Sequence, residues 1–159
     1  MTAATASRGK EWLALVGFAV LSYGVAALGS LATLDNVRGW YAVAEKPPYS
    51  PPNWLFGPVW TVLYGLIAVA GWLVWRRRDR PALVAWGVQL ALNLAWTPTF
   101  FALQWLWVGL VVIVALDVAV VVTILRFRRV RPVAAWLLVP YLAWILFATA
   151  LNAGVAALN

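Results

Sequence analysis

The chain contains no cysteine and no histidine among its 159 residues. Without thiols or imidazoles it cannot form disulfides, a thiolate nucleophile, a histidine general base or the usual transition-metal sites. A haem held by axial histidine or cysteine is excluded for the same reason. We therefore expect no metal site and no cofactor, and a porphyrin bound here would be held through its ring and its carboxylates.

Charge is also scarce, because charged residues make up 11% of the chain and hydrophobic residues 65%, with a mean hydropathy of +0.86. Soluble globular domains do not have this composition. Apolar runs that each reach the ~20 residues needed to cross a bilayer as a helix lie at about 12–33, 54–75, 82–103, 107–125 and 133–157. We predict an all-α integral membrane protein, a bundle of five transmembrane helices that forms a single domain over residues 1–159. The first run is longer than the apolar core of a signal peptide, so we interpret it as a helix of the bundle.

The basic residues divide unevenly between the two ends of such a bundle. With five spans, one end carries ten of the twelve Lys and Arg residues, namely Arg8, Lys10, Arg76, Arg77, Arg78, Arg80, Arg126, Arg128, Arg129 and Arg131. The positive-inside rule then predicts a cytoplasmic N-terminus and an outside C-terminus. We interpret the basic loops as topology signals that also attract anionic membrane lipid, and we expect no nucleic-acid partner.

The longest predicted loop, at 34–53, contains Trp40 and has four prolines between positions 47 and 52, and Trp54 and Trp60 follow it. Proline fixes φ and favours an extended conformation in the preceding residue, so this loop should be stiff. It lies on the outer side of the predicted bundle. We expect it to act as a lid or a wall.

Polar and aromatic side chains share one face of the third and of the fifth predicted helices. Helical spacing brings together Gln89, Asn93, Trp96, Thr97 and Phe100 on the third, and Tyr141, Trp144, Ala148 and Asn152 on the fifth. Amides inside a bilayer need hydrogen-bond partners, so both faces should point into the bundle or a cavity. On the first helix, small residues recur at Ser22, Ala26 and Ser30, a spacing that indicates close helix packing within the chain or, alternatively, a dimer face.

Asp117 is the one carboxylate deep in a predicted span, and no Lys or Arg lies at its depth. An ionised group there is costly, so we expect Asp117 to be protonated or hydrogen-bonded to Gln89 or Asn93. Two roles stay open for it: a structural hydrogen bond, or a direct part in function such as a proton or ion path.

Several of these residues lie at similar depths beneath the proline-rich loop, namely Trp60, Thr97, Phe100, Ala148 and Asn152, with Trp144 a turn deeper. An apolar cavity with a few convergent polar groups is the usual form of a small-molecule site. We therefore predict an outward-facing pocket for a flat hydrophobic ligand. Simple packing is the alternative explanation for Trp60 and Trp144.

Several motifs of the chain resemble the TspO/MBR family, whose members are called translocator proteins or tryptophan-rich sensory proteins, and once peripheral benzodiazepine receptors. The motifs are WY at 40–41, KPPYSPP at 46–52, GPVW at 57–60, NLAWTP at 93–98 and PYLAW at 140–144. The resemblance covers nearly the whole chain. Two departures are Tyr49, where the family often has Trp, and the end of the fifth helix, which lacks the pattern proposed for cholesterol.

The resemblance implies a five-helix bundle, often a homodimer, that binds porphyrins and isoquinoline- or benzodiazepine-type ligands beneath the first loop. For a bacterial member it implies the plasma membrane. By motif match the pocket would be lined by Tyr41, Trp60, Thr97, Phe100, Trp144 and Ala148, and Asp117 would occupy the polar position of the fourth helix. We add as candidate ligand-binding residues Tyr64, Asn93, Tyr141 and Asn152.

On these grounds we expect a membrane receptor, sensor or transporter that binds porphyrins and regulates tetrapyrrole metabolism or a stress response. Polar groups near Arg38, Lys46 and Asn152 would meet the porphyrin carboxylates. The alternative is an enzyme-like degradation of porphyrin that depends on light or oxygen, in which Trp60 and Trp144 would take part. No general base is present for ground-state acid–base catalysis, so we favour a binding protein over an enzyme. A third hypothesis is a scaffolding membrane protein whose pocket reflects packing alone.

Overall fold

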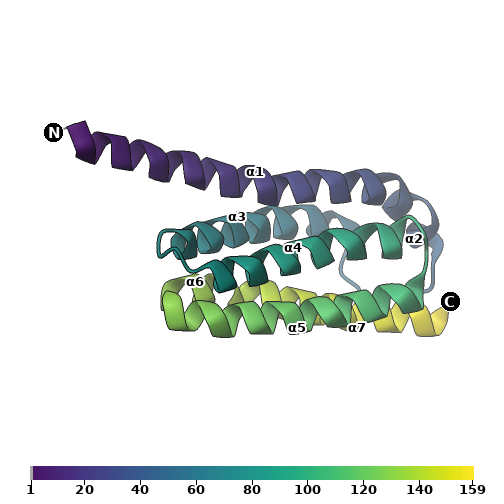
Figure 1. Ribbon diagram of the computed structural model, residues 1–159. Helices are drawn as coiled ribbons and strands as arrows, with labels where there is room; N and C mark the ends of the chain where they lie inside the picture. Colours follow the sequence, from purple (N-terminus) through teal and green to yellow (C-terminus); the bar gives the residue numbers. More distant parts are fainter. Residues whose placement is uncertain (1) are drawn as a thin grey trace.

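A computed structural model describes residues 2–159, with side chains described from Ser7 onward. The helices in chain order are α1 (Thr2–Arg38), α2 (Trp40–Val43), a 3-10 turn η1 (Asn53–Leu55), α3 (Phe56–Trp75), α4 (Arg80–Phe101), α5 (Leu106–Val130), α6 (Pro132–Leu137) and α7 (Val139–Leu158). The long helices run side by side along one axis, with α1 against α3 and α4, and α5 against α4 and α7 (Figure 1). The N-terminus and the C-terminus lie at opposite ends of this bundle.

Four segments of the described chain are long and apolar enough to cross a membrane: Ser7–Arg38, Asn53–Trp75, Leu106–Val130 and Pro132–Leu158. Together with the composition, they make this an integral, multi-pass membrane protein. Helix α4 has a similar length but is not among the four. Its polar residues Gln89, Asn93 and Thr97 dilute its apolar character, so the expected count of five spans remains a prediction.

The first helix and the loop after it differ from the predicted boundaries. Helix α1 continues to Arg38, and the backbone N–H of Gly39 still donates to the carbonyl of Asp35 at 2.8 Å. The polar residues at 35–38 are compatible with a helix, and Gly39 is the first position with a poor helix propensity. The short α2 then follows, so the irregular segment spans 44–52 rather than the predicted 34–53.

The predicted helix at 133–157 is divided into α6 and α7 at Leu138. The cause is Pro140, which has no backbone N–H to donate to the carbonyl of Trp136. Proline is accepted in the first turn of a helix, so it becomes the second residue of α7. The remaining shifts are smaller, since α4 begins at Arg80 rather than 82 and α5 runs to Val130 rather than 125.

Three helices meet most closely around Gly71 of α3. A Cβ atom at this position would lie 2.7 Å from the Trp86 ring of α4 and 2.9 Å from Phe18 of α1. Trp86 and Phe18 also contact each other edge to face, with ring centroids 4.9 Å apart. Glycine is required because the two aromatic rings occupy the place of a side chain. This contact separates two hollow regions of the bundle that are described below.

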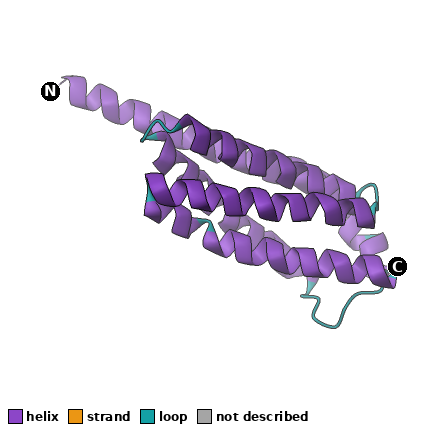
Figure 2. Ribbon diagram, turned by 60° about the horizontal axis from the view of Figure 1, so that its bottom comes forward, coloured by secondary structure: helices purple, strands orange, loops and turns teal. Residues whose placement is uncertain are grey.

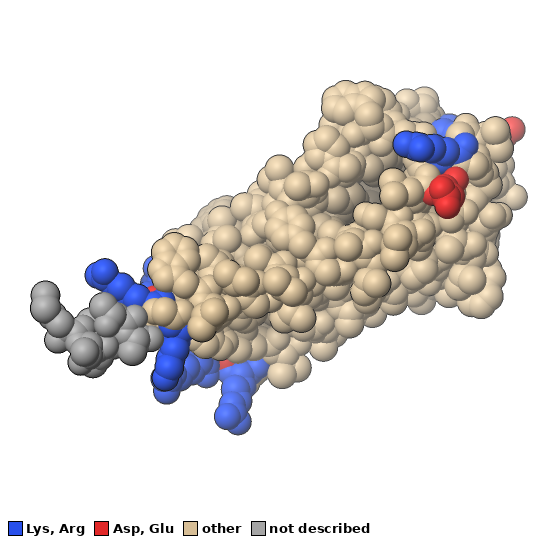
Figure 3. Space-filling model, turned by 90° about the horizontal axis from the view of Figure 1, so that it is seen from above, with Lys and Arg blue, Asp and Glu red and all other residues tan. Residues whose placement is uncertain are grey.

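Charge is segregated along the bundle axis. Lys and Arg side chains gather at the end that carries the start of α1 and the turns between α3 and α4 and between α5 and α6 (Figure 3). A smaller group of basic and acidic side chains lies at the opposite end. The uneven division of basic residues seen in the sequence is therefore an uneven division in space.

Candidate ligand-binding cavity

A cavity of about 550 Å³ lies at the end of the bundle opposite the basic turns. Its walls come from the second half of α1, the start of α3, the end of α4 and the middle of α7, with further contributions from α2 and η1. We call it the aromatic cavity, because Trp60, Trp96, Phe100 and Trp144 form much of its lining.

Eight of the eleven predicted ligand-binding residues line the aromatic cavity, namely Tyr41, Trp60, Tyr64, Thr97, Phe100, Trp144, Ala148 and Asn152. They come from four different helices, and helical spacing alone predicted that those on α4 and α7 would share a face. Asn93, Asp117 and Tyr141 do not line it. Their side chains are engaged within the protein instead.

The aromatic side chains pack against each other and not only against the void. The rings of Trp96 and Phe100 are stacked, with centroids 5.8 Å apart and an interplanar angle of 27°. Trp60 lies 5.5 Å from Tyr64, and Trp144 lies 6.0 Å from Phe56, between ring centroids. Aromatic pairs of this kind restrict one another. The cavity therefore has firm, flat walls.

A chain of buried hydrogen bonds lies behind this wall. The Tyr64 hydroxyl donates to Asn93 Oδ1 at 2.7 Å, and Asn93 Nδ2 donates to the Tyr141 hydroxyl at 2.9 Å. The Tyr141 hydroxyl in turn donates to Gln89 Oε1 at 2.9 Å. This chain joins α3, α4 and α7. Asn93 and Tyr141 are fully buried within it and do not reach the cavity.

Asp117 has a different partner from the predicted ones. Its Oδ2 atom accepts a hydrogen bond from Thr149 Oγ1 of α7 at 2.8 Å, and neither Gln89 nor Asn93 bonds to it. Asp117 is buried and hydrogen-bonded, as predicted, but the predicted partners, Gln89 and Asn93, were wrong. Helix α5 turns this residue toward α7, whereas Asn93 faces the hydroxyls of Tyr64 and Tyr141.

Asn152 lines the cavity, yet its amide is already engaged. Asn152 Oδ1 accepts from Trp96 Nε1 at 3.1 Å, and Nδ2 donates to the carbonyl of Leu106 at 2.9 Å. A Cβ at Gly109 would lie 3.2 Å from Asn152 Oδ1, so glycine leaves the amide its place. Asn152 thus ties α7 to α4 and to the start of α5.

Lys46 was expected near ligand carboxylates, but it is engaged by its own loop. Its ammonium donates to the carbonyls of Tyr41, Ala42 and Ala44 at 2.6, 3.2 and 3.1 Å. It also lies 5.0 Å from the centroid of the Tyr41 ring. Burial raises the pKa of Tyr41 to about 12, so this phenol stays neutral at physiological pH. Lys46 therefore caps α2, and it is Arg38 that lines the cavity.

The proline-rich segment at 44–52 does not line the aromatic cavity. It is fastened to the end of α7 (Figure 2). The Tyr49 hydroxyl donates to the carbonyl of Ala150 at 3.0 Å, and Glu45 and Asn159 exchange two hydrogen bonds at 3.1 and 2.8 Å. Pro47 and Tyr49 also approach Gly154 so closely that a Cβ there would lie within 2.8 and 2.9 Å of them. The flanks of the loop, at Tyr41 and at Asn53 and Trp54, supply the lining instead.

Comparison with known proteins decides the family, since residues 18–158 match the TspO/MBR family. The chain belongs to the TspO/MBR family. It is 46% identical over 144 residues to the tryptophan-rich protein TspO of Archaeoglobus fulgidus, covering 89% of this chain and 92% of that protein. It is 37% identical over 147 residues to the translocator protein of Homo sapiens, covering 89% and 87% of the two chains. It is 33% identical over 150 residues to the tryptophan-rich sensory protein of Cereibacter sphaeroides, covering 94% and 93%.

Four of the five TspO/MBR motifs contribute to the aromatic cavity, and KPPYSPP at 46–52 is the exception. GPVW supplies Trp60, NLAWTP supplies Trp96 and Thr97, and PYLAW supplies Trp144. Motifs that lie far apart in the chain therefore form one surface.

Sequence reasoning missed the contribution of α1 and of the loop flank. Tyr23, Gly29 and Thr33 of α1 line the cavity, as do Trp54 of η1 and Phe56 at the start of α3. The recurrence of small residues on α1 was the available signal, but it was interpreted as packing within the chain or, alternatively, as a dimer face. Ala26 and Ser30 from that recurrence line the cavity, and Ser22 is fully buried.

Proposed function

We propose that this protein is a membrane receptor, sensor or transporter that holds porphyrins and similar flat hydrophobic ligands in the aromatic cavity. The observation that carries the proposal is a cavity of about 550 Å³ with firm aromatic walls inside a membrane bundle. Small-molecule sites have roughly 300–1,000 Å³ and a mostly apolar lining with a few polar groups. Relatives that are named translocator protein and tryptophan-rich sensory protein support a receptor or sensor role.

The walls suit a planar ligand because they are planar themselves and are held from behind. Tyr64 is fixed by its hydrogen bond to Asn93, and Trp96 is fixed by its hydrogen bond to Asn152. Rings that are already immobile lose little entropy when a ligand stacks on them. The polar groups of α4 and α7 thus contribute by positioning aromatic rings.

Two polar groups of the cavity lining are especially suited to meet a ligand. Trp144 Nε1 is buried without a hydrogen-bond partner in the described part of the chain, and its indole lines the cavity. An unpaired buried N–H gains a hydrogen bond when a ligand acceptor is placed there. The exposed guanidinium of Arg38 lines the same cavity and is suited to a ligand carboxylate. Lys46 and Asn152 already make hydrogen bonds within the protein. Of the three groups expected to bind a ligand carboxylate, Arg38 is therefore the one that we propose.

We further propose that α4 crosses the membrane as a fifth span, with the N-terminus in the cytoplasm. The segregation of Lys and Arg to one end supports this orientation by the positive-inside rule. Burial of the polar face of α4 against α3 and α7 supports its place in the bilayer, because both polar atoms of the Asn93 amide and the Gln89 Oε1 atom have hydrogen-bond partners there. The aromatic cavity then lies at the outer end.

A titration with protoporphyrin tests the proposal. The purified protein is followed by tryptophan fluorescence in darkness, beside Trp60→Phe, Trp144→Phe and the control Trp136→Phe, whose side chain is 71% exposed on α6. We expect saturable quenching that each cavity substitution weakens about three- to tenfold, the range for one aromatic contact. The control should bind like the unaltered protein. Absence of saturable binding would overturn the proposal.

The enzyme-like alternative is favoured by one observation. Trp60 contacts both Tyr64 and Tyr141, with ring centroids 5.5 and 6.2 Å apart, so an oxidised tryptophan would have phenols as neighbours. The same samples under illumination, in the presence of oxygen, distinguish the two functions. Loss of the porphyrin absorption band that Trp60→Phe and Trp144→Phe abolish, with binding retained, would support degradation. A stable band would leave binding as the function.

A further inference from the structure

A second cavity, which we call the basic groove, lies at the opposite end of the bundle and has a volume of about 1270 Å³. It opens between the start of α1 and the turn from α3 to α4, where α1 extends away from the other helices (Figure 1). Phe18, which contacts Trp86, is one of its lining residues. The basic groove shares no lining residue with the aromatic cavity.

One end of the basic groove is strongly cationic. Lys10, Arg76, Arg78 and Arg80 line it together with a single carboxylate, that of Glu11. Arg76 pairs with Glu11 at 3.3 Å. Within residues 7–159 this is the one ion pair, so no carboxylate in that part of the chain forms an ion pair with Lys10, Arg78 or Arg80.

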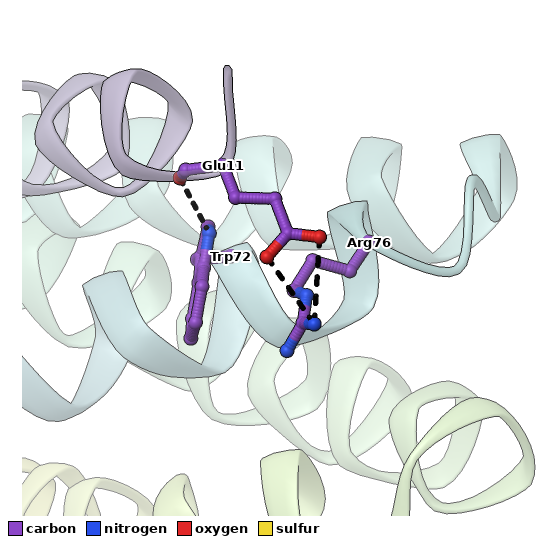
Figure 4. Close-up of polar contacts among 3 residues, drawn as sticks. All are labelled: Glu11, Trp72 and Arg76. Atoms are coloured by element: carbon purple, nitrogen blue, oxygen red, sulfur yellow. Dashed lines mark hydrogen bonds and ion pairs between the residues drawn. The ribbon is translucent and has the colours of Figure 1, made fainter. Parts of the chain in front are cut away.

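The position of α1 at this end is held by two contacts to α3 (Figure 4). Trp72 Nε1 donates to the backbone carbonyl of Glu11 at 3.0 Å, and the Arg76 guanidinium both pairs with Glu11 and lies 5.0 Å from the Trp72 ring centroid. Glu11 and Arg76 are thus occupied in holding the helix. The three other cations are left to face the groove.

The remainder of the groove is apolar and follows α1 away from these charges. Leu13, Gly17, Phe18 and Leu21 line it on one helical face, with Leu83 of α4 on the other side. Leu13 and Leu21 are 74% and 56% exposed, and a Cβ at Gly17 would meet nothing within 4 Å. From Lys10 to Leu21 a helix rises about 16 Å, which matches the ~15 Å of one leaflet of the hydrocarbon core.

We propose that the basic groove binds one anionic phospholipid of the surrounding bilayer. Its phosphate lies among Lys10, Arg78 and Arg80, and one acyl chain lies along the α1 face from Leu13 to Leu21. The cationic end of the groove would meet the lipid headgroup, and the apolar face that follows it along α1 would meet the acyl chain. A net negative headgroup is selected because the cations outnumber the carboxylate, whereas a zwitterionic headgroup brings its own compensating positive charge.

Native mass spectrometry of the purified full-length chain in detergent tests this proposal. The protein is titrated with phosphatidylglycerol and with phosphatidylcholine of the same acyl chains, and the bound lipids are counted. We expect one phosphatidylglycerol to be retained in preference to phosphatidylcholine. Inorganic phosphate and glycerol 3-phosphate serve as competitors, because they carry the anion without the chain. Displacement by these at concentrations comparable to the lipid would show a free-anion site and overturn the proposal.

A charge-matched pair of variants separates the groove from general attraction. The triple variant Lys10→Gln/Arg78→Asn/Arg80→Gln removes the free cations, and Asn is chosen at 78 because the backbone there has a φ of 56°, which asparagine tolerates. The preference should fall at least about tenfold, since each cation near an anionic surface contributes about a factor of five. The control Arg77→Gln/Arg128→Gln/Arg129→Gln removes as many charges outside the groove and should keep the preference. Equal losses in both would overturn the proposal.

A second matched pair tests the apolar part without changing charge. Gly17→Leu should fill the groove beside Leu13 and Leu21 and reduce lipid retention several-fold. Gly24→Leu places the same side chain on the same helix, where a Cβ also meets nothing within 4 Å but outside both cavities, and should leave retention unchanged. Circular dichroism confirms that each variant is folded. Full retention by folded Gly17→Leu would show that no acyl chain lies in the groove.

Discussion

The aromatic cavity and the basic groove lie at opposite ends of one bundle. They differ in whether the polar side chains near them are hydrogen-bonded within the protein. Around the cavity, Asn93, Tyr141 and Asn152 are hydrogen-bonded within the protein, so that aromatic faces meet the void. In the groove, Lys10 and Arg80 face open space. The difference teaches that a polar residue near a membrane site can act either by holding a wall or by meeting a ligand, and only its partners distinguish the two.

The largest expected effect is on the buried network behind the cavity. Asn93→Leu removes two hydrogen bonds and leaves the hydroxyls of Tyr64 and Tyr141 short of partners. We expect a loss of about 3 kcal/mol in the free energy of unfolding, measured by thermal denaturation in detergent, and weaker porphyrin binding. Lipid retention in the groove should be unchanged in the folded fraction. As a control, Asn36→Leu loses only one bond to a backbone carbonyl on its own helix and should have a much smaller effect.

A single added methyl group at Gly71, where α1, α3 and α4 meet, should lower the stability of the protein. Gly71→Ala places a Cβ 2.7 Å from the Trp86 ring and 2.9 Å from Phe18. Overpacking of this kind costs about 1–3 kcal/mol, and both the cavity and the groove should be disturbed. The matched substitution Gly87→Ala meets nothing within 4 Å and should raise the melting temperature, because alanine favours a helix by about 1 kcal/mol. Equal melting temperatures for the two variants would contradict the packing at Gly71.

A smaller effect is expected at the loop that flanks the cavity. Tyr49→Phe keeps the ring against Phe147, with centroids 6.4 Å apart, but removes the hydrogen bond to Ala150. The stability should fall by about 1 kcal/mol or less. Amide hydrogen exchange within 44–52 should become faster, while exchange in α4 and α5 stays the same. If exchange in the loop did not change, the fastening to α7 would have to rest on other contacts.

The smallest effect on stability is expected for a substitution in the basic groove, which should change lipid binding without changing the free energy of unfolding. Glu11→Gln removes an ion pair whose side chains are 40% and 38% exposed, and such pairs contribute less than about 1 kcal/mol. The melting temperature should hardly move. Retention of phosphatidylglycerol should nevertheless increase, because the one carboxylate of the groove is lost. A decrease would mean that Arg76 depends on Glu11 for its position.

Helical periodicity predicted which residues share a face, and this held for the cavity side of α4 and α7. Spacing placed Thr97 and Phe100 on one face of α4 and Trp144 and Ala148 on one face of α7, similar depths suggested that the two faces meet, and all four residues line the cavity. Gln89 and Asn93 belong to the same predicted face of α4 but do not line it. Family motifs added Tyr41, which spacing could not have placed because it lies outside the long helices. The family itself was also predictable, since its motifs are spread over the whole chain.

Spacing could not predict the partner of a polar residue. Asp117 bonds to Thr149, and Lys46 bonds to the carbonyls that end α2. Each pairing depends on how one helix is rotated about its axis or on how a loop folds back. Helical periodicity in the sequence determines neither of these. The break at Leu138 followed from Pro140, which the sequence displays, but the apolar run continues on both sides of it and concealed the boundary.

The fastening of the proline-rich segment to α7 has a kinetic consequence for any molecule held in the aromatic cavity. The contacts of Tyr49, Pro47 and Glu45 with α7 lie outside the lining, so they do not touch a bound ligand. They restrain the flanks of the segment at Tyr41 and Trp54, and these two residues line the cavity. Loosening them would speed the departure of the ligand more than its arrival, because mobile flanks must be ordered again on each binding event. The residence time of a ligand is therefore set in part at the C-terminal end of α7, at residues that the ligand never touches.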